Sequence, residues 1–109
     1  MSKFFDFTST GVAEHTGTAL ENYLIHGMAP GGFLLAVLKN NLYDAVSRAD
    51  SVNSVSLSNI VRWIHSYAPM ESYGNSEMIK HWCNNTNDIR KNYVYELKQS
   101  SAYRKLISK

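Results

Sequence analysis

The chain has 109 residues, of which 44% are hydrophobic and 18% are charged. This composition is typical of a globular protein rather than of a disordered chain, and the length supports one domain with one hydrophobic core. Eleven lysine and arginine residues against nine acidic residues give a formal net charge of +2. That charge is too small to imply nucleic acid or an anionic membrane as an obligate partner.

The two ends of the chain differ in character from its middle. Residues 1–15 show no clear helical pattern, so we expect a flexible N-terminal segment there. Residues 88–109 carry six basic side chains against two acidic ones, and we expect them to form a basic C-terminal helix or tail. No linker divides the chain, which is therefore treated as a single domain over residues 1–109.

The cysteine content and the hydropathy of the chain indicate its cellular compartment. The single cysteine, Cys83, excludes an intrachain disulfide, which favours a reducing compartment. Charged residues interrupt the N-terminus, so no signal peptide is expected. The longest uncharged apolar stretch, from Met28 to Leu38, is about half of a membrane span. We therefore predict a cytoplasmic protein with no membrane partner.

The spacing of apolar residues is helical along the chain. A first helix is expected over residues 16–26, because its apolar residues fall mostly on one face and Gly27 follows as a helix-ending residue. The central helix is expected over residues 33–50. There an apolar run from Phe33 to Leu38 continues at helical spacing as far as Asp50.

Three further helices follow the central one. A polar break over residues 51–56 precedes a helix capped by Ser56 and ended by Pro69. Ser76 opens a short helix that reaches Cys83, and apolar residues from Ile89 to Leu106 indicate a last helix. The predicted fold is all-α: a single compact domain of about five helices around a central hydrophobic helix.

Several spaced signatures occur within residues 23–83. A Pro-Gly-Gly-Phe turn at residues 30–33 opens an apolar helix, a Tyr-x-x-x-Gly segment precedes it at 23–27, and Pro69, Tyr73-Gly74 and Trp82 follow it. This pattern resembles a small all-helical protein family encoded by tailed bacteriophages, for which no activity is established. The resemblance implies a setting, the cytoplasm of a phage-infected bacterium, more than a mechanism.

Motifs for catalysis, metals and cofactors are weak. His81 and Cys83 could supply two metal ligands, but the sequence has no second pair to complete a zinc site. A dyad of these two residues is disfavoured because they point about 200° apart around a helix. We therefore predict no catalytic residue, no metal and no cofactor. A hydrolase that uses His81 or His65 is the least favoured hypothesis.

A polar set surrounds the predicted central helix and its exit, and it consists of Asn40, Asp44, Asp50 and Asn53. Such residues are typical of helix caps and turns, and Asp44 has an i,i+4 partner in Arg48. Capping and solvation are the favoured interpretation. A small-ligand site is the alternative.

Aromatic residues near the N-terminus are candidates for binding a partner protein. Three of them, Phe4, Phe5 and Phe7, either fold back onto the core or project as an anchor, since aromatic residues dominate interface hot spots. With Tyr73 they form the predicted partner-binding set. The leading hypothesis is a non-enzymatic phage-type protein that modulates a host or phage protein, as an inhibitor of the host-takeover or anti-defence kind.

The alternative function is a nucleic-acid-binding regulator. Ala49, Asn53 and the segment that begins at Ser56 approximate a helix-turn-helix whose spacing is one residue too long. The C-terminal segment mixes basic and aromatic side chains, which can track phosphates and stack on bases. The residues that would contact nucleic acid are Arg62, Arg90, Lys91, Lys98, Arg104 and Lys105.

Overall fold

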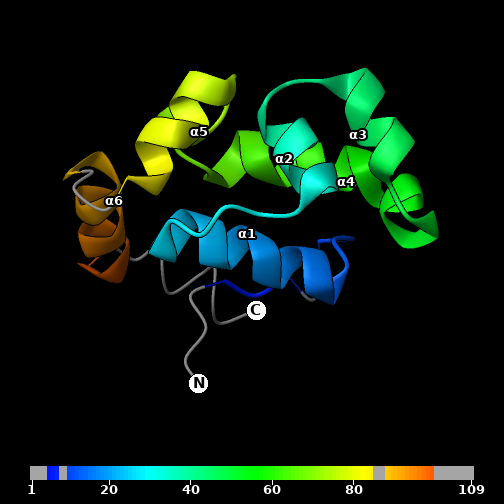
Figure 1. Cartoon of the computed structure of the whole chain (residues 1–109). Coiled ribbons are helices and arrows are strands. Elements are labelled where there is room, and N and C mark those ends of the chain that lie inside the picture. Colours follow the sequence, from blue (N-terminus) through cyan, green and yellow to red (C-terminus); the bar gives the residue numbers. More distant parts are fainter. Residues whose placement is uncertain (1–4, 8–9, 85–87, 100–109) are drawn as a thin grey trace.

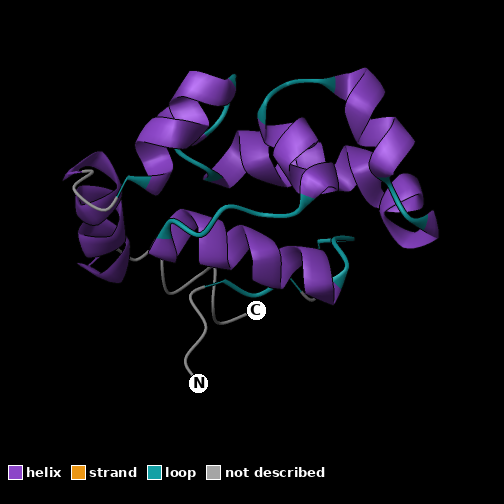
Figure 2. Cartoon of the chain, in the orientation of Figure 1, coloured by secondary structure: helices purple, strands orange, loops and turns teal. Residues whose placement is uncertain are grey.

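The computed structural model describes residues 5–7, 10–84 and 88–99, and these residues form helices with no strand among them (Figures 1 and 2). The predicted all-α class is confirmed. The α-helices are α1 (Glu14–His26), α2 (Gly32–Leu38), α3 (Leu42–Arg48), α4 (Ser51–Tyr67), α5 (Ser76–Cys83) and α6 (Asp88–Gln99), and a 3-10 helix, η1, covers Met70–Ser72.

The helices are arranged around α1, which runs beneath α2 and α4 in the view of Figure 1. Helices α5 and α6 lie at one end of the molecule, and α3 lies at the other. The radius of gyration is 13.3 Å, close to the value of about 13 Å expected for a compact domain of roughly 100 residues. The described helices therefore form one compact body.

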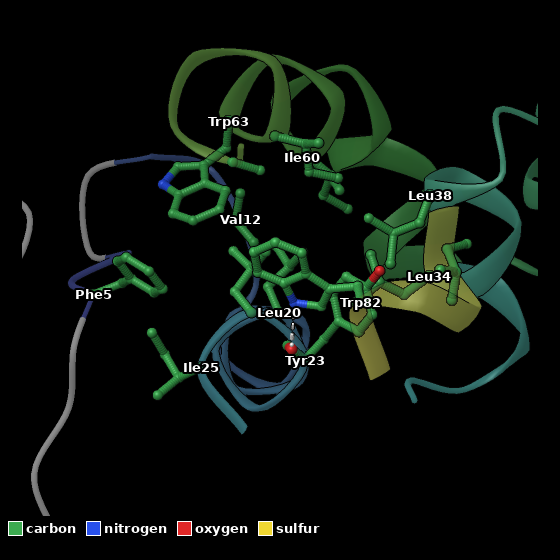
Figure 3. Packing of buried hydrophobic residues seen from close by; sticks show 14 of the residues in the cluster. Phe5, Val12, Leu20, Tyr23, Ile25, Leu34, Leu38, Ile60, Trp63 and Trp82 are labelled. Atoms are coloured by element: carbon green, nitrogen blue, oxygen red, sulfur yellow. Dashed lines mark hydrogen bonds between the residues drawn. The ribbon is translucent and has the colours of Figure 1, made fainter. Parts of the chain in front are cut away.

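Buried apolar residues from five helices pack together in one cluster (Figure 3). Trp82 lies at the centre of this packing, and its indole N–H donates to the backbone carbonyl of Tyr23 (3.1 Å). The helical members of the cluster are Leu20, Tyr23, Leu24 and Ile25 from α1, Leu34 and Leu38 from α2, Ile60, Trp63 and Ile64 from α4, Ile79 and Trp82 from α5, and Leu97 from α6.

The predicted central helix over residues 33–50 is wrong, because the chain breaks there into α2 and α3. Asn40 takes a left-handed φ of 66°, and the N–H groups of Asn40 and Asn41 donate back to the carbonyls of Val37 and Ala36. This pattern ends a helix. The Asn41 side chain then accepts the Asp44 N–H (3.1 Å) and starts α3. The described residues therefore hold six α-helices rather than about five.

The predicted polar break over residues 51–56 is also wrong, because α4 already begins at Ser51. The carboxylate of Asp50 accepts the Asn53 N–H (2.7 Å) and caps the helix, so the observed cap lies six residues before the predicted cap at Ser56. Ser56 lies inside α4, where its hydroxyl donates to the carbonyl of Val52 (3.0 Å). The polar residues of this stretch make hydrogen bonds within or beside the helix, so they do not interrupt it.

Other predicted boundaries agree with the structure. Gly27 ends α1 in a left-handed conformation with φ of 70°, α4 ends two residues before Pro69, and α5 covers Ser76–Cys83. The last helix begins at Asp88, and its predicted extension beyond Gln99 lies outside the described residues.

The described part of the N-terminal segment packs against the core. The Phe5 ring is 1% exposed and makes an edge-on contact with Trp63, with the ring centres 5.2 Å apart. Phe7 packs on the same indole at 4.8 Å and covers Gly17, where a Cβ atom would overlap its ring. The close approach of this segment to α1 therefore depends on a glycine.

Candidate functional site

An open cavity of about 380 Å³ lies where α2, α3, α4 and the loop after η1 meet. Its lining is mostly apolar, and it consists of Val37, Leu38, Asn40, Asn41, Leu42, Ala45, Leu57, Val61, Ile64, His65, Tyr73 and Gly74. Leu38, Ala45 and Ile64 are buried residues of the fold, whereas Leu42 and Val61 are 67% and 47% exposed. The cavity thus joins the packed interior to the surface.

The wall formed by the loop after η1 is fixed by hydrogen bonds. The Gly74 N–H donates to the carbonyl of Leu38 (2.7 Å), and Gly74 has a φ of 129° that favours glycine. The hydroxyl of Tyr23 donates to the carbonyl of the buried Ser72 (2.7 Å), and the Ser72 hydroxyl donates to the Pro69 carbonyl (2.6 Å). Tyr73 is therefore placed at the cavity by bonds on both sides of it.

Four lining side chains can make hydrogen bonds: Asn40, Asn41, His65 and Tyr73. The Asn41 side-chain oxygen already accepts the Asp44 N–H at the start of α3. None of the described lining residues is a carboxylate, a cysteine or a serine, and the described part of the chain holds no group of three metal-ligating side chains. The mostly apolar lining suits binding of an apolar group.

The predicted partner-binding residues are divided by the fold. Phe4 lies outside the described residues. Phe5 and Phe7 fold back onto Trp63. Phe5 is buried and Phe7 is half-buried, so the alternative in which the two rings project away from the fold as surface anchors is wrong. Tyr73 is half-buried at the cavity. Of the predicted set, the structure places only Tyr73 at this site among the residues that it describes.

The predicted nucleic-acid residues are also divided. Arg62 on α4 and Lys91 and Lys98 on α6 are exposed, and Lys98 has an interaction with a neighbour. Arg104 and Lys105 lie outside the described residues. The structure does not gather the described members of this set on one element.

Arg90 is not a surface cation, which corrects its assignment as a nucleic-acid contact. Its side chain is buried and donates to the backbone carbonyl of Trp82 (2.6 Å) at the end of α5. The guanidinium also covers Gly27, where a Cβ atom would overlap it. A cation beside two helix C-termini is electrostatically favourable. Arg90 therefore connects α6 to the ends of α1 and α5.

The predicted helix-turn-helix register is wrong. Only Ala49 and Asp50 separate α3 from α4. Asn53, which the motif would place in the turn, lies buried in the first turn of α4, and Ser56 lies inside that helix. The turn predicted between them does not exist.

The polar set of Asn40, Asp44, Asp50 and Asn53 does not form one site. Asn40 lines the cavity. Asp44 pairs with Arg48 through both carboxylate oxygens (3.1 Å each), and Asp50 caps α4. Asn53 accepts the hydroxyl proton of Thr16 (2.6 Å), which ties α4 to α1. Asp44, Asp50 and Asn53 are thus each engaged in an interaction within the fold: an ion pair, a helix cap and a hydrogen bond between helices.

Cys83, His65 and His81 were the residues considered for nucleophilic catalysis, and the structure places them on two helices. Burial raises the pKa of the Cys83 thiol, and the nearby Arg90 opposes this only in part, so the reactive thiolate is disfavoured. His65 and His81 are exposed on different helices, α4 and α5. His65 lines the cavity without a carboxylate among the described lining residues.

The cavity was not predicted from the sequence, because residues 33–50 were expected to form one helix. The cavity exists because α3 turns away from α2 at Asn40. The signal was present in Asn40-Asn41, since asparagine is common both after a helix in the left-handed conformation and as a helix cap.

No helix in the described part of the chain is long and apolar enough to cross a membrane. Comparisons with models of protein families, with curated proteins and with solved structures find no match to this chain.

Proposed function

We propose that this chain is a non-enzymatic protein-binding domain that modulates a protein of a bacterial host or of a phage, as an inhibitor of the host-takeover or anti-defence kind. The observation that carries the binding function is the open apolar cavity, with Leu42 and Val61 exposed at it. Interface hot spots are commonly large side chains seated in such pockets. The phage setting rests on the resemblance of residues 23–83.

Helix α3 supports a binding role. It has seven residues, of which only Ala45 is buried, and a helix of this length has little stability of its own in water. Besides Leu42, it exposes Tyr43 and Val46 to solvent. Exposed apolar side chains gathered on one short element are typical of interaction sites rather than of inert surface.

The test is capture of a partner protein from a bacterial lysate after nuclease treatment. Wild-type chain is compared with Val61→Trp, which fills the cavity at its exposed side, and with Val55→Trp. Val55 lies on the same helix, is 86% exposed and does not line the cavity, so it is the matched control.

Wild type and Val55→Trp are expected to retain the same protein, and Val61→Trp is expected to lose it. Equal retention by Val61→Trp, or no captured protein, contradicts the proposal. Capture that disappears with nuclease supports the nucleic-acid alternative instead.

A further inference from the structure

We infer that the cavity receives an acidic amphipathic helix of the partner protein, anchored by one large apolar side chain. This inference rests on the proposed function and specifies its partner. It follows from three features of the site: the elements that border the cavity, its size, and the charges beside it.

The bordering elements favour a helical occupant. Leu57, Val61 and Ile64 lie three and four residues apart along α4, and Leu42 and Ala45 lie three apart on α3. Two helices with apolar stripes form a groove that suits the apolar face of a third helix. The described residues include no strand, so they offer no sheet edge to which an extended peptide could add.

The size of the cavity limits what enters it. Its volume of about 380 Å³ is near the lower end of the roughly 300–1,000 Å³ of small-ligand pockets. It therefore admits one large side chain while the rest of the partner helix lies across its opening. Because buried Leu38, Ala45 and Ile64 belong to the lining, that side chain would complete the packing of the core.

Two exposed basic residues adjoin lining residues of the cavity along the chain. Lys39 stands between the lining residues Leu38 and Asn40, and Arg62 follows the lining residue Val61. Both are exposed, and within the described residues no ion pair with a carboxylate is formed by either. Asp44, the acidic residue of α3, is already paired with Arg48. An occupant with carboxylates on its polar face would complement these two cations.

The experiment selects peptides from a random twelve-residue library on immobilised full-length chain. We expect enriched peptides to carry net negative charge and a large apolar residue repeated at three- or four-residue spacing. Enrichment of basic or uncharged peptides, or of none, would overturn the inference.

Each selected peptide is then measured against variants of the chain. Val61→Trp is expected to weaken binding at least tenfold. Lys39→Glu combined with Arg62→Glu is expected to weaken it about threefold to tenfold, as exposed ion pairs do, and the loss should shrink at high salt. Val55→Trp and Lys91→Glu, on exposed positions away from the lining, are the matched controls and should change nothing. Peptides that bind Val61→Trp as well as wild type contradict the inference.

Capture of the partner by the variant chains distinguishes failure of this inference from failure of the proposed function. If Val61→Trp loses the partner and the Lys39→Glu, Arg62→Glu chain retains it fully, the binding function stands and the acidic helix is wrong. If Val61→Trp also retains it, both are wrong.

Discussion

The end of the molecule formed by the C-terminal end of α1 with α5 and α6 is closed, in the sense that its central side chains are covered. The end formed by α2, α3 and the middle of α4 is open, because a cavity there reaches the surface. At the closed end, Trp82 is fully buried and its indole N–H donates a hydrogen bond to the Tyr23 carbonyl. The Arg90 guanidinium donates a hydrogen bond to the Trp82 carbonyl at the end of α5. At the open end, Leu42 and Val61 border a cavity. Both ends are helical, so the difference lies in what covers the helices. Stability should depend on the first end and binding on the second.

The largest expected loss of stability is at the closed end. Trp82→Ala should lower the free energy of unfolding by about 3–5 kcal/mol, because it empties a fully buried site and removes the bond to the Tyr23 carbonyl. Denaturant unfolding measures the effect, with Val55→Ala on the exposed surface as control. A loss below about 1 kcal/mol would mean that the core is not centred on this residue.

A pair of leucines tests the boundary between the two ends. Leu38→Ala should cost about 2–5 kcal/mol because Leu38, the last residue of α2, is buried in the core. Leu42→Ala, only four residues further on, should change stability by less than about 0.5 kcal/mol because that side chain is mostly exposed. Equal costs in urea unfolding would contradict the break at Asn40 and restore a single helix.

Two glycines test the contact of Arg90 with α1. Gly27→Ala should cost about 1–2 kcal/mol for the left-handed backbone alone and more for the overlap with the guanidinium. Gly31→Ala is the control, because Gly31 has open space around it and a negative φ of −68°. The loss of a glycine at the N-cap of α2 is offset by the lower conformational entropy of the unfolded chain, so the variant should stay within about 0.5 kcal/mol of wild type. If Gly27→Ala costs as much stability in the Arg90→Ala background as in wild type, the Arg90 side chain does not contact α1 at Gly27.

Two tyrosines give the smallest effect and a dependence on pH. Tyr23→Phe should cost about 0.5–1.5 kcal/mol because it removes the bond to the Ser72 carbonyl. Tyr93→Phe should cost nothing or stabilise, since the buried Tyr93 hydroxyl has no hydrogen-bond partner among the described residues. Thermal unfolding distinguishes them, and a larger loss for Tyr93→Phe would contradict the assignment.

Burial raises the pKa of both tyrosines above the ordinary value near 10. The unfolded chain therefore releases these protons at lower pH than the folded chain. The contribution of these two tyrosines to stability should be constant below about pH 10 and should fall as the pH rises further. Either phenylalanine variant should lessen this fall, and an unchanged alkaline profile would mean that the hydroxyl concerned is not buried in the folded chain.

The sequence predicted the helical class and the helix ends that single residues determine. Gly27 and Pro69 act through their own backbone preferences, so the helices ended where expected. The break at Asn40 was missed because the apolar pattern on both sides of it continues at helical spacing. The start of α4 was missed because a polar helix start and a polar loop have similar compositions, and only the bond from Asn53 to Asp50 distinguishes them.

The candidate site was less predictable than the fold. Tyr73 was singled out, but Leu57, Val61 and Ile64 have the spacing of any core-facing helix residues. Which of them remain uncovered depends on where α3 lies, a long-range property. In the same way, Phe5 and Arg90 are residue types that often bind partners at a protein surface. Their burial follows only from long-range contacts, of Phe5 with Trp63 and of Arg90 with Gly27.

Hydrogen–deuterium exchange of the chain with and without its captured partner tests the central claim most directly. Exchange reports which backbone segments a partner covers or stabilises. The account predicts added protection in α3, in residues 57–65 of α4 and at residues 73–74, with α6 unchanged. Protection confined to α5 and α6, with the open end exchanging as in the free chain, would contradict it.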